Sequence, residues 1–205
     1  KYLADAVVLL TRDPCANREK IADAARRLSR SVSQSAEIVE RVRSYAKDIS
    51  AKETVDLCKL LKETVEELSS LETVKPEFIV SRDVGSALIQ GDPVALKIAF
   101  ANLIKNACEA AAQAGPSVPG AVKVEILRED GVLTVRIDNT GKILPPDFVD
   151  NLGRPMTSTK AGGLGYGILI AVTILEANKG AVGFRRRPEG GLHVSARFPV
   201  FATPA

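Results

Sequence analysis

The sequence has few of the residues that hold small secreted or metal-dependent domains together. Its 205 residues include three cysteines, which are far apart and lack metal-ligand spacing, and one histidine. An odd number of scattered cysteines is typical of reduced thiols in a cytosolic setting and predicts no structural metal site. The chain must therefore fold around an apolar core, and 45% apolar residues suffice for one core of ordinary size plus a modest appendage.

Long apolar runs and a strong charge of one sign are absent as well. No stretch approaches the roughly 20 apolar residues that cross a bilayer, and the first residues show no signal-peptide pattern. The net charge is only +3, with acidic and basic residues interleaved, which argues against a nucleic-acid partner. We expect a cytoplasmic chain, which can still be the cytoplasmic part of a membrane-anchored protein.

Residues 1–48 have the pattern of an antiparallel helical hairpin, with a turn at Asp13-Pro14. In the longer arm, two interleaved series of mostly apolar residues recur at every seventh position. They are Ile21, Leu28, Ser35 and Val42, and Ala25, Val32, Val39 and Ala46. Such a seam packs against another helix, so we expect a homodimer formed through these N-terminal helices.

The first arm of this hairpin is too short to cover the seam. It spans about 12 residues against about 28 in the second arm, so roughly 16 residues of the seam lack a mate within the chain. Either a second copy covers them, or the chain begins partway along the first helix.

Residues 49–205 predict a different, α+β domain. Short apolar strands are expected at 77–81 and 87–90, a long helix from Asp92-Pro93, a hairpin around Glu129-Asp130-Gly131, and a helix over 165–178 before a last strand pair. This order favours a two-layer α/β sandwich in which a mixed, mainly antiparallel sheet carries helices on one face.

The long helix contains two asparagines that point from one face. Asn102 and Asn106 are four residues apart, with Lys105 and Glu109 beside them. This spacing alone also fits an ordinary polar helix face. Both asparagines, however, lie in an apolar run, where a buried amide without a partner costs about 1 to 3 kcal/mol.

Two loops further along the chain have the composition of a nucleotide site. The strand ending at Ile137 runs into Asp138-Asn139-Thr140-Gly141, where a polar side chain can read a base. The glycine-rich run 160–167 leads into an apolar helix, a geometry that presents backbone N–H groups and a positive helix end to phosphates. A glycine run alone also fits a flexible turn, but the helix and both loops in this order rarely occur by chance.

These segments resemble the motifs of sensor histidine kinases, whose catalytic domain shares the ATP-binding fold of DNA gyrase, the Hsp90 chaperone and MutL. Asn102–Ala110 (NLIKNACEA) resembles the N box, and Asn139-Thr-Gly141 stands where the first glycine box begins. Arg154–Lys160 resembles the lid sequence and Gly163–Gly167 the second glycine box. Residues 1–48 resemble part of the family's dimerisation and phosphoacceptor bundle.

The resemblance implies ATP and Mg²⁺ as cofactors and catalytic roles for Asn102, Lys105 and Asn106. The Asn106 carbonyl would ligate the metal, and Lys105 and Lys160 would meet phosphates. The residues implied to contact the nucleotide are Asn106, Glu109, Asn139, Gly141, Thr159, Lys160, Gly163, Leu164, Gly165, Tyr166 and Gly167. ATP-hydrolysing relatives place a glutamate where this chain has Asn102, an amide that cannot activate water, so phosphate transfer is favoured over hydrolysis.

The chain departs from the family pattern in its first glycine box. Asn139 replaces the usual adenine-binding aspartate, while Asp138 faces the opposite side of the strand. An amide oxygen still accepts a hydrogen bond, but more weakly than a carboxylate, so we predict adenine affinity about fivefold lower than with Asp. Ile143 replaces the second glycine and should stiffen the loop.

The phosphoacceptor histidine is also missing. The single histidine, His193, is expected in the last strand, facing solvent or the sheet edge, with a contact near the adenine pocket as the alternative. We therefore expect a truncated kinase whose acceptor histidine lies upstream and whose phosphate passes to a response regulator receiver domain. A non-catalytic module that docks a response regulator and binds nucleotide weakly or not at all remains the alternative.

Overall fold

The computed structural model describes residues 52–82, 84–115, 118–153 and 166–200, together with residues 22, 23 and 26. The chain divides into two compact units, Lys1–Ser44 and Tyr45–Ala205. In the first unit the described residues are helical. The predicted hairpin and its seam otherwise lie outside the described residues, and the domain boundary after residue 48 stays a prediction.

The second unit alternates helices and strands as the sequence predicts. The elements are β1 (Glu53–Asp56), α3 (Leu57–Leu71), β2 (Pro76–Val80), β3 (Leu88–Gly91), α4 (Pro93–Ala112), β4 (Val122–Glu129), β5 (Val132–Asn139), α5 (Pro146–Val149), α6 (Tyr166–Ala177), β6 (Ala181–Arg186) and β7 (Leu192–Pro199). The sequence did not predict the short helix α5, nor that β1 pairs with β3 in an antiparallel manner.

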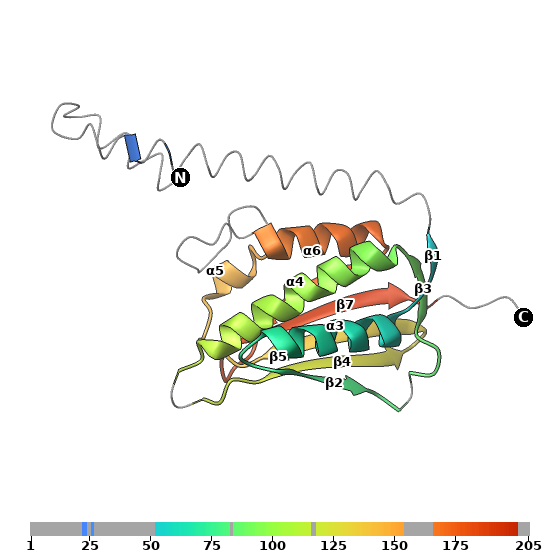
Figure 1. Ribbon diagram of the computed structural model, residues 1–205, viewed down its shortest axis with the longest axis horizontal. Helices are drawn as coiled ribbons and strands as arrows, with labels where there is room; N and C mark the ends of the chain where they lie inside the picture. Colours follow the sequence, from blue (N-terminus) through green and yellow to red (C-terminus); the bar gives the residue numbers. More distant parts are fainter. Residues whose placement is uncertain are drawn as a thin grey trace, which may run out of the picture. The chain divides into compact units, whose positions relative to one another are not determined.

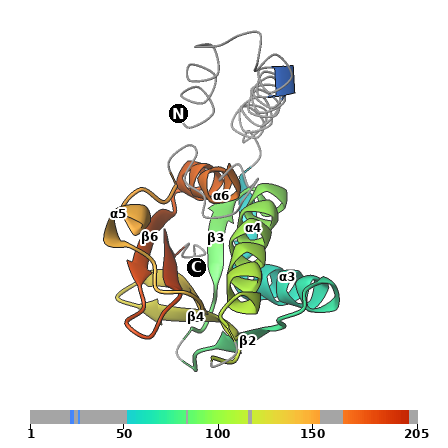
Figure 2. The same cartoon turned by 90° about the vertical axis from the view of Figure 1, so that its left-hand side faces the viewer.

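The main sheet has five strands in the order β2-β4-β5-β7-β6, with β2 and β4 parallel and the other pairs antiparallel. Helices α3, α4 and α6 pack on one face of it (Figures 1 and 2). This confirms the predicted two-layer sandwich with a mixed, mainly antiparallel sheet. The side chains that share the other face, called the open face below, include Lys123, Glu125, Arg136, Asp138, Arg185, His193, Ser195 and Arg197.

Local sequence signals fix where several elements begin and turn. Asp56 caps α3 by accepting the backbone N–H of Cys58 at 2.9 Å, and Asp92 caps α4 by accepting those of Val94 and Ala95 at 2.9 and 3.0 Å. Asp130 and Gly131 both have positive φ, 50° and 75°, as a two-residue hairpin turn between twisted strands requires.

The core lies between the three helices and the inner face of the sheet. Phe100 of α4 meets Phe198 of β7 there, with ring centroids 6.3 Å apart, and both side chains are fully buried. Burial of such apolar surface is the main stabilising contribution to the domain. Within the described ranges, no helix is both long and apolar enough to cross a membrane.

Candidate functional site

One face of α4 carries the two asparagines that the sequence singled out. Asn102 and Asn106 are both half-buried, and the Asn102 amide group donates a hydrogen bond to the Ile98 carbonyl oxygen at 3.1 Å. Ala110 continues the same face one turn further on. Lys105 is exposed beside Asn106, and Glu109 is half-buried.

The start of α6 lies against these asparagines. A Cβ atom placed on Gly167 would lie 3.2 Å from the Asn106 Nδ2 atom and 3.7 Å from the Asn102 Oδ1 atom. The structure therefore brings together Asn106 of the long helix and Gly167 at the end of the glycine-rich run, which are far apart in the sequence. A helix start carries backbone N–H groups that lack intrahelical partners and a partial positive charge, and this one lies beside Asn106.

A buried asparagine fixes the other ends of the same two helices. The Asn178 Oδ1 atom, just after α6, accepts the Asp92 backbone N–H at 2.8 Å, where α4 begins. Its Nδ2 atom donates to the Ile174 carbonyl oxygen at 2.8 Å. Contacts at both ends thus hold α4 and α6 side by side and antiparallel, which sets the position of Gly167 along α4 (Figure 1).

Asn139 is the last residue of β5 and is 4% exposed on the helix-covered side of the sheet. Its Nδ2 atom donates to the Thr140 carbonyl oxygen at 2.7 Å, which leaves the amide oxygen as the atom that can accept a hydrogen bond. A Cβ on Gly141 would lie 3.3 Å from that Nδ2 atom and 3.5 Å from the Ala110 carbonyl oxygen. The first glycine loop therefore adjoins the same face of α4, one turn beyond Asn106.

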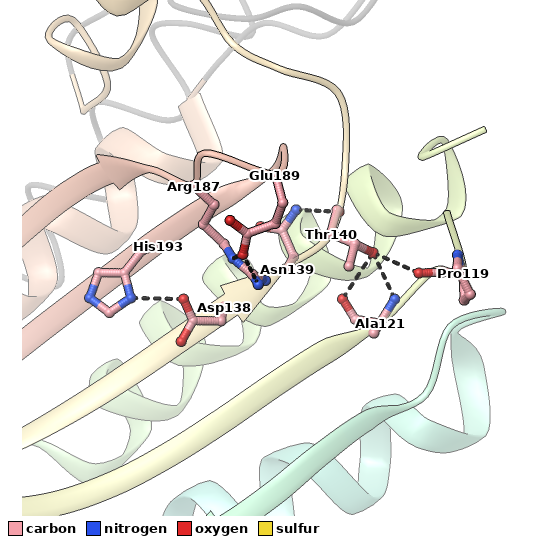
Figure 3. A network of polar contacts seen from close by, with 8 residues as sticks. All are labelled: Pro119, Ala121, Asp138, Asn139, Thr140, Arg187, Glu189 and His193. Atoms are coloured by element: carbon pink, nitrogen blue, oxygen red, sulfur yellow. Dashed lines mark hydrogen bonds and ion pairs between the residues drawn. The ribbon is translucent and has the colours of Figure 1, made fainter. Parts of the chain in front are cut away.

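Thr140 fastens this loop to the segment before β4 (Figure 3). Its hydroxyl accepts the Ala121 backbone N–H at 2.8 Å and donates to the Pro119 carbonyl oxygen at 3.1 Å. Its own backbone N–H donates to the Ala121 carbonyl oxygen at 3.0 Å. Sequence reasoning gave Thr140 no role, since nothing local shows that residues 119–121 lie beside it.

Two glycines before β7 press against the same loop. Gly190 and Gly191 have φ of +99° and +91°, and a Cβ on Gly191 would lie 1.9 Å from the Asn139 carbonyl oxygen. A Cβ on Gly190 would lie 2.4 Å from the Gly141 carbonyl oxygen. Only glycine fits either place. The sequence signal was the glycine pair itself, which marked a turn but not what it contacts.

His193 lies on the open face, in an internal strand and not at the sheet edge. Its Nδ1 atom is 2.8 Å from the Asp138 Oδ1 atom, and the side chains are 17% and 25% exposed (Figure 3). Asp138 thus points away from the buried Asn139, as the alternation along the strand predicts. In the turn before β7, the Arg187 guanidinium pairs with Glu189, and the Glu189 backbone N–H and then Arg187 lower the pKa of that carboxyl.

The remaining predicted site residues are described in part or not at all. Thr159, Lys160, Gly163, Leu164 and Gly165 lie outside the described residues. Tyr166 is the first residue of α6. Ile143, which stands in place of a family glycine, is 73% exposed.

The chemistry of the described site is that of amides and backbone groups. Among the described residues, no group of three or more His, Cys, Asp or Glu side chains could hold a metal ion. Cys108, on the core side of α4, is 1% exposed, and burial followed by the negative charge of Glu72 raises its pKa to about 11. This thiol is therefore neutral at physiological pH and gives no sign of a chemical role.

Comparison with known proteins agrees with this arrangement. Residues 91–202, more than half of the chain, match the family described as histidine kinase-, DNA gyrase B- and HSP90-like ATPase. Sporulation kinase A of Bacillus subtilis is 31% identical over 153 residues, which cover 73% of this chain and 24% of that protein. Sporulation kinase B of the same organism is 27% identical over 94% of this chain and 44% of its own length. The chain thus spans less than half the length of these relatives.

Solved structures share the fold. The mycobacterial sensor histidine kinase MprB aligns with a TM-score of 0.61 at 21% identity, covering 73% of this chain and 97% of that one. Full-length ShkA in complex with AMPPNP aligns with a TM-score of 0.67 at 23% identity, covering 92% of this chain and 39% of that one. These likenesses agree in fold with the matched family, and that match shows that the chain belongs to the histidine kinase-, DNA gyrase B- and HSP90-like ATPase family.

Proposed function

We propose that this chain is the kinase core of a sensor histidine kinase, which binds ATP with Mg²⁺ and transfers the γ-phosphate to a histidine side chain. An imidazole nitrogen attacks the γ-phosphorus, and ADP leaves. The phosphate then passes from the histidine to an aspartate on a response regulator receiver domain. We propose that the protein acts as a cytoplasmic homodimer joined through its N-terminal helices.

The observation that carries this proposal is the contact of Gly167 with Asn106. A Cβ at residue 167 would lie only 3.2 Å from the Asn106 Nδ2 atom, which is tighter than most contacts, so glycine lets the start of α6 approach that side chain without displacing it. Backbone N–H donors and an amide oxygen then converge on one small region, which suits phosphate oxygens and their metal ion.

The described residues fit Mg²⁺ held mainly by the nucleotide. The Asn106 carbonyl is a hard oxygen ligand, and phosphates and water commonly complete the octahedron of Mg²⁺. When bound, the ion neutralises negative charge on the phosphates during transfer. Asn139 would accept a hydrogen bond from the adenine amino group, Lys105 and Lys160 would contact phosphates, and residues 154–160, which resemble the family's lid, would cover the nucleotide.

Transfer is favoured over hydrolysis because Asn102 stands one helical turn before Asn106. Its amide group already donates to the Ile98 carbonyl oxygen, and an amide cannot take a proton from water. A water molecule beside the γ-phosphate would therefore lack a base, whereas a histidine needs none to attack.

Calorimetric titration with MgATP tests the binding step. We expect saturable binding that the Asn106→Ala variant weakens about tenfold or more, through loss of the metal ligand. Lys62→Ala, an exposed change on α3, is the matched control and should bind as the wild type does. Binding that ignores Asn106→Ala would contradict the proposal, and no binding at all would favour the non-catalytic module.

Labelling with γ-³²P-ATP tests the transfer step. The chain alone should gain no acid-labile phosphate, because its single histidine lies in β7 and is bonded to Asp138. A separately produced helical bundle that carries an acceptor histidine should become labelled when it is added. Labelling of His193 itself would contradict this account.

A further inference from the structure

On the open face, Asp138 of β5 lies opposite His193 of β7. This is the second-to-last cross-strand pair before the two strands separate. The ladder ends with the next pair, Asn139 and Leu192, so the Asp138–His193 contact lies directly behind the side chain proposed to read adenine. The Nδ1–Oδ1 distance is 2.8 Å, and both side chains are mostly shielded from solvent. This histidine is the only one in the sequence.

Beyond this pair the two chains are still in close contact. The Gly191 backbone N–H donates to the Lys142 carbonyl oxygen at 3.1 Å, and Gly191 packs so tightly on the Asn139 carbonyl that no Cβ would fit. A small displacement of the start of β7 therefore pushes directly on the backbone of Asn139. Interiors packed this closely transmit displacements instead of absorbing them.

We propose that Asp138 and His193 are a positioning pair that holds Asn139 in register for the nucleotide base. The inference rests on the proposed nucleotide-binding function. Neither side chain touches the nucleotide, because both point to the open face, and they act through the backbone of Asn139 and Gly191.

The bond joins the two strands where their ladder is about to end. A hydrogen bond to a carboxylate is stronger than one between neutral groups, and this one is mostly shielded from solvent. Its loss therefore leaves the start of β7 less firmly held against Asn139.

Other charged groups share the open face with this pair. They are Arg185 of β6 opposite His193, Lys123 and Glu125 of β4, Arg136 of β5 and Arg197 of β7. Lys123 is paired with Glu125 at 3.3 Å, and Arg136 lies 3.8 Å from Glu129. Asp138 is the carboxylate that contacts the ring.

Calorimetric titration of variants with MgATP gives the test. His193→Ala removes the N–H donor, whereas His193→Asn keeps one near the Nδ1 position. Ser195→Ala is the matched control, on the same strand and face but two pairs further from the loop.

We expect His193→Ala to bind MgATP about fivefold more weakly than the wild type, and Ser195→Ala to bind like it. His193→Asn should recover most of that loss, because its side chain can still donate a hydrogen bond to Asp138. A His193→Ala chain with wild-type affinity, or a His193→Asn chain that binds as weakly as His193→Ala, overturns the positioning role.

Nuclear magnetic resonance on the wild-type, tag-free chain gives a second test that needs no variant. With one histidine, the imidazole signal reports His193 alone. Coupling is reciprocal, so saturating MgADP should shift this signal although the ring points away from the nucleotide. A signal that MgADP leaves unmoved overturns the inference while leaving the proposed function intact. Failure of the wild type to bind any nucleotide overturns both.

Discussion

Replacement of Asn139 by aspartate should have two opposite effects, on the stability of the free domain and on its affinity for nucleotide. The Asn139 Nδ2 atom donates to the Thr140 carbonyl oxygen at 2.7 Å, and the side chain is buried. Asn139→Asp replaces that donor with a carboxylate oxygen facing the same carbonyl. Loss of a buried hydrogen bond costs about 1 to 3 kcal/mol, so the nucleotide-free domain should lose roughly that much unfolding free energy.

The same change should strengthen the nucleotide complex. A carboxylate accepts a hydrogen bond from the adenine amino group more strongly than an amide does, by about 1 kcal/mol or about fivefold in the dissociation constant. Moreover, the repulsion between the aspartate oxygen and the Thr140 carbonyl oxygen destabilises the free protein. When a base is bound, the aspartate can turn toward it, and this repulsion is relieved. The variant should therefore be less stable when free and bind MgATP more tightly.

Urea unfolding without nucleotide and calorimetric titration with MgATP measure the two effects separately. The matched control is Asn151→Asp, because the Asn151 Nδ2 atom makes the same kind of bond to the Asp147 carbonyl oxygen, at 2.6 Å, but at an exposed position. That control should change stability by less than about 0.5 kcal/mol and leave affinity unaltered.

Each outcome refutes a different step. If Asn139→Asp leaves MgATP affinity unchanged or weaker, Asn139 is not the acceptor for the base. If the free variant is as stable as the wild type, the bond to the Thr140 carbonyl does not contribute to the fold. Equal effects in Asn151→Asp would show that the change reports added charge and not the site.

Further changes test local features. Gly167→Ala brings a Cβ to 3.2 Å from the Asn106 amide and should weaken MgATP binding about tenfold, with thermal unfolding as the check that the fold persists. Lys179 follows α6 and has a φ of +63°. Lys179→Gly should raise the unfolding free energy by about 0.5 kcal/mol, measured by urea unfolding, because glycine adopts this left-handed conformation without strain. A lower unfolding free energy in the variant would show that Lys179 is not strained there. Burial raises the pKa of Cys108 to about 11, and burial followed by the Asp56 charge raises the pKa of the half-exposed Cys58. Iodoacetamide labelling followed by mass spectrometry should therefore be slow at neutral pH, faster as the pH rises, and faster at Cys58 than at Cys108. Equal labelling rates at the two cysteines would contradict this.

Local sequence patterns were sufficient for most of the fold. Asp92-Pro93 marks the start of α4, and Asp130-Gly131 marks a two-residue hairpin, because capping and turn geometry depend on a few adjacent residues. The predicted end of β5 fell short by two residues. The strand continues to Asn139 because β4 and β7 both pair with it there, and a strand's length depends on such distant partners.

The sequence also named the residues of the candidate site, since Asn102 and Asn106 in an apolar run, the Asn139 loop and the glycine-rich run are all local patterns. It could not show that Gly167 meets Asn106, or that Thr140 is held by Pro119 and Ala121. These contacts join segments that are far apart in the chain. The packing of α6 on α4 determines the first, and the place where β5 ends beside the segment before β4 determines the second.

What the sequence alone determined was therefore the chemistry of the site: amides in place of carboxylates at Asn102 and Asn139, and a single histidine. What only the tertiary structure decided was where those groups lie. Asn139 is buried beneath α4 with its Nδ2 atom bonded to a carbonyl, whereas the adjacent Asp138 reaches the open face and meets His193. The physical reason is that composition sets which interactions a chain can make, while packing and strand register select the pairs that form.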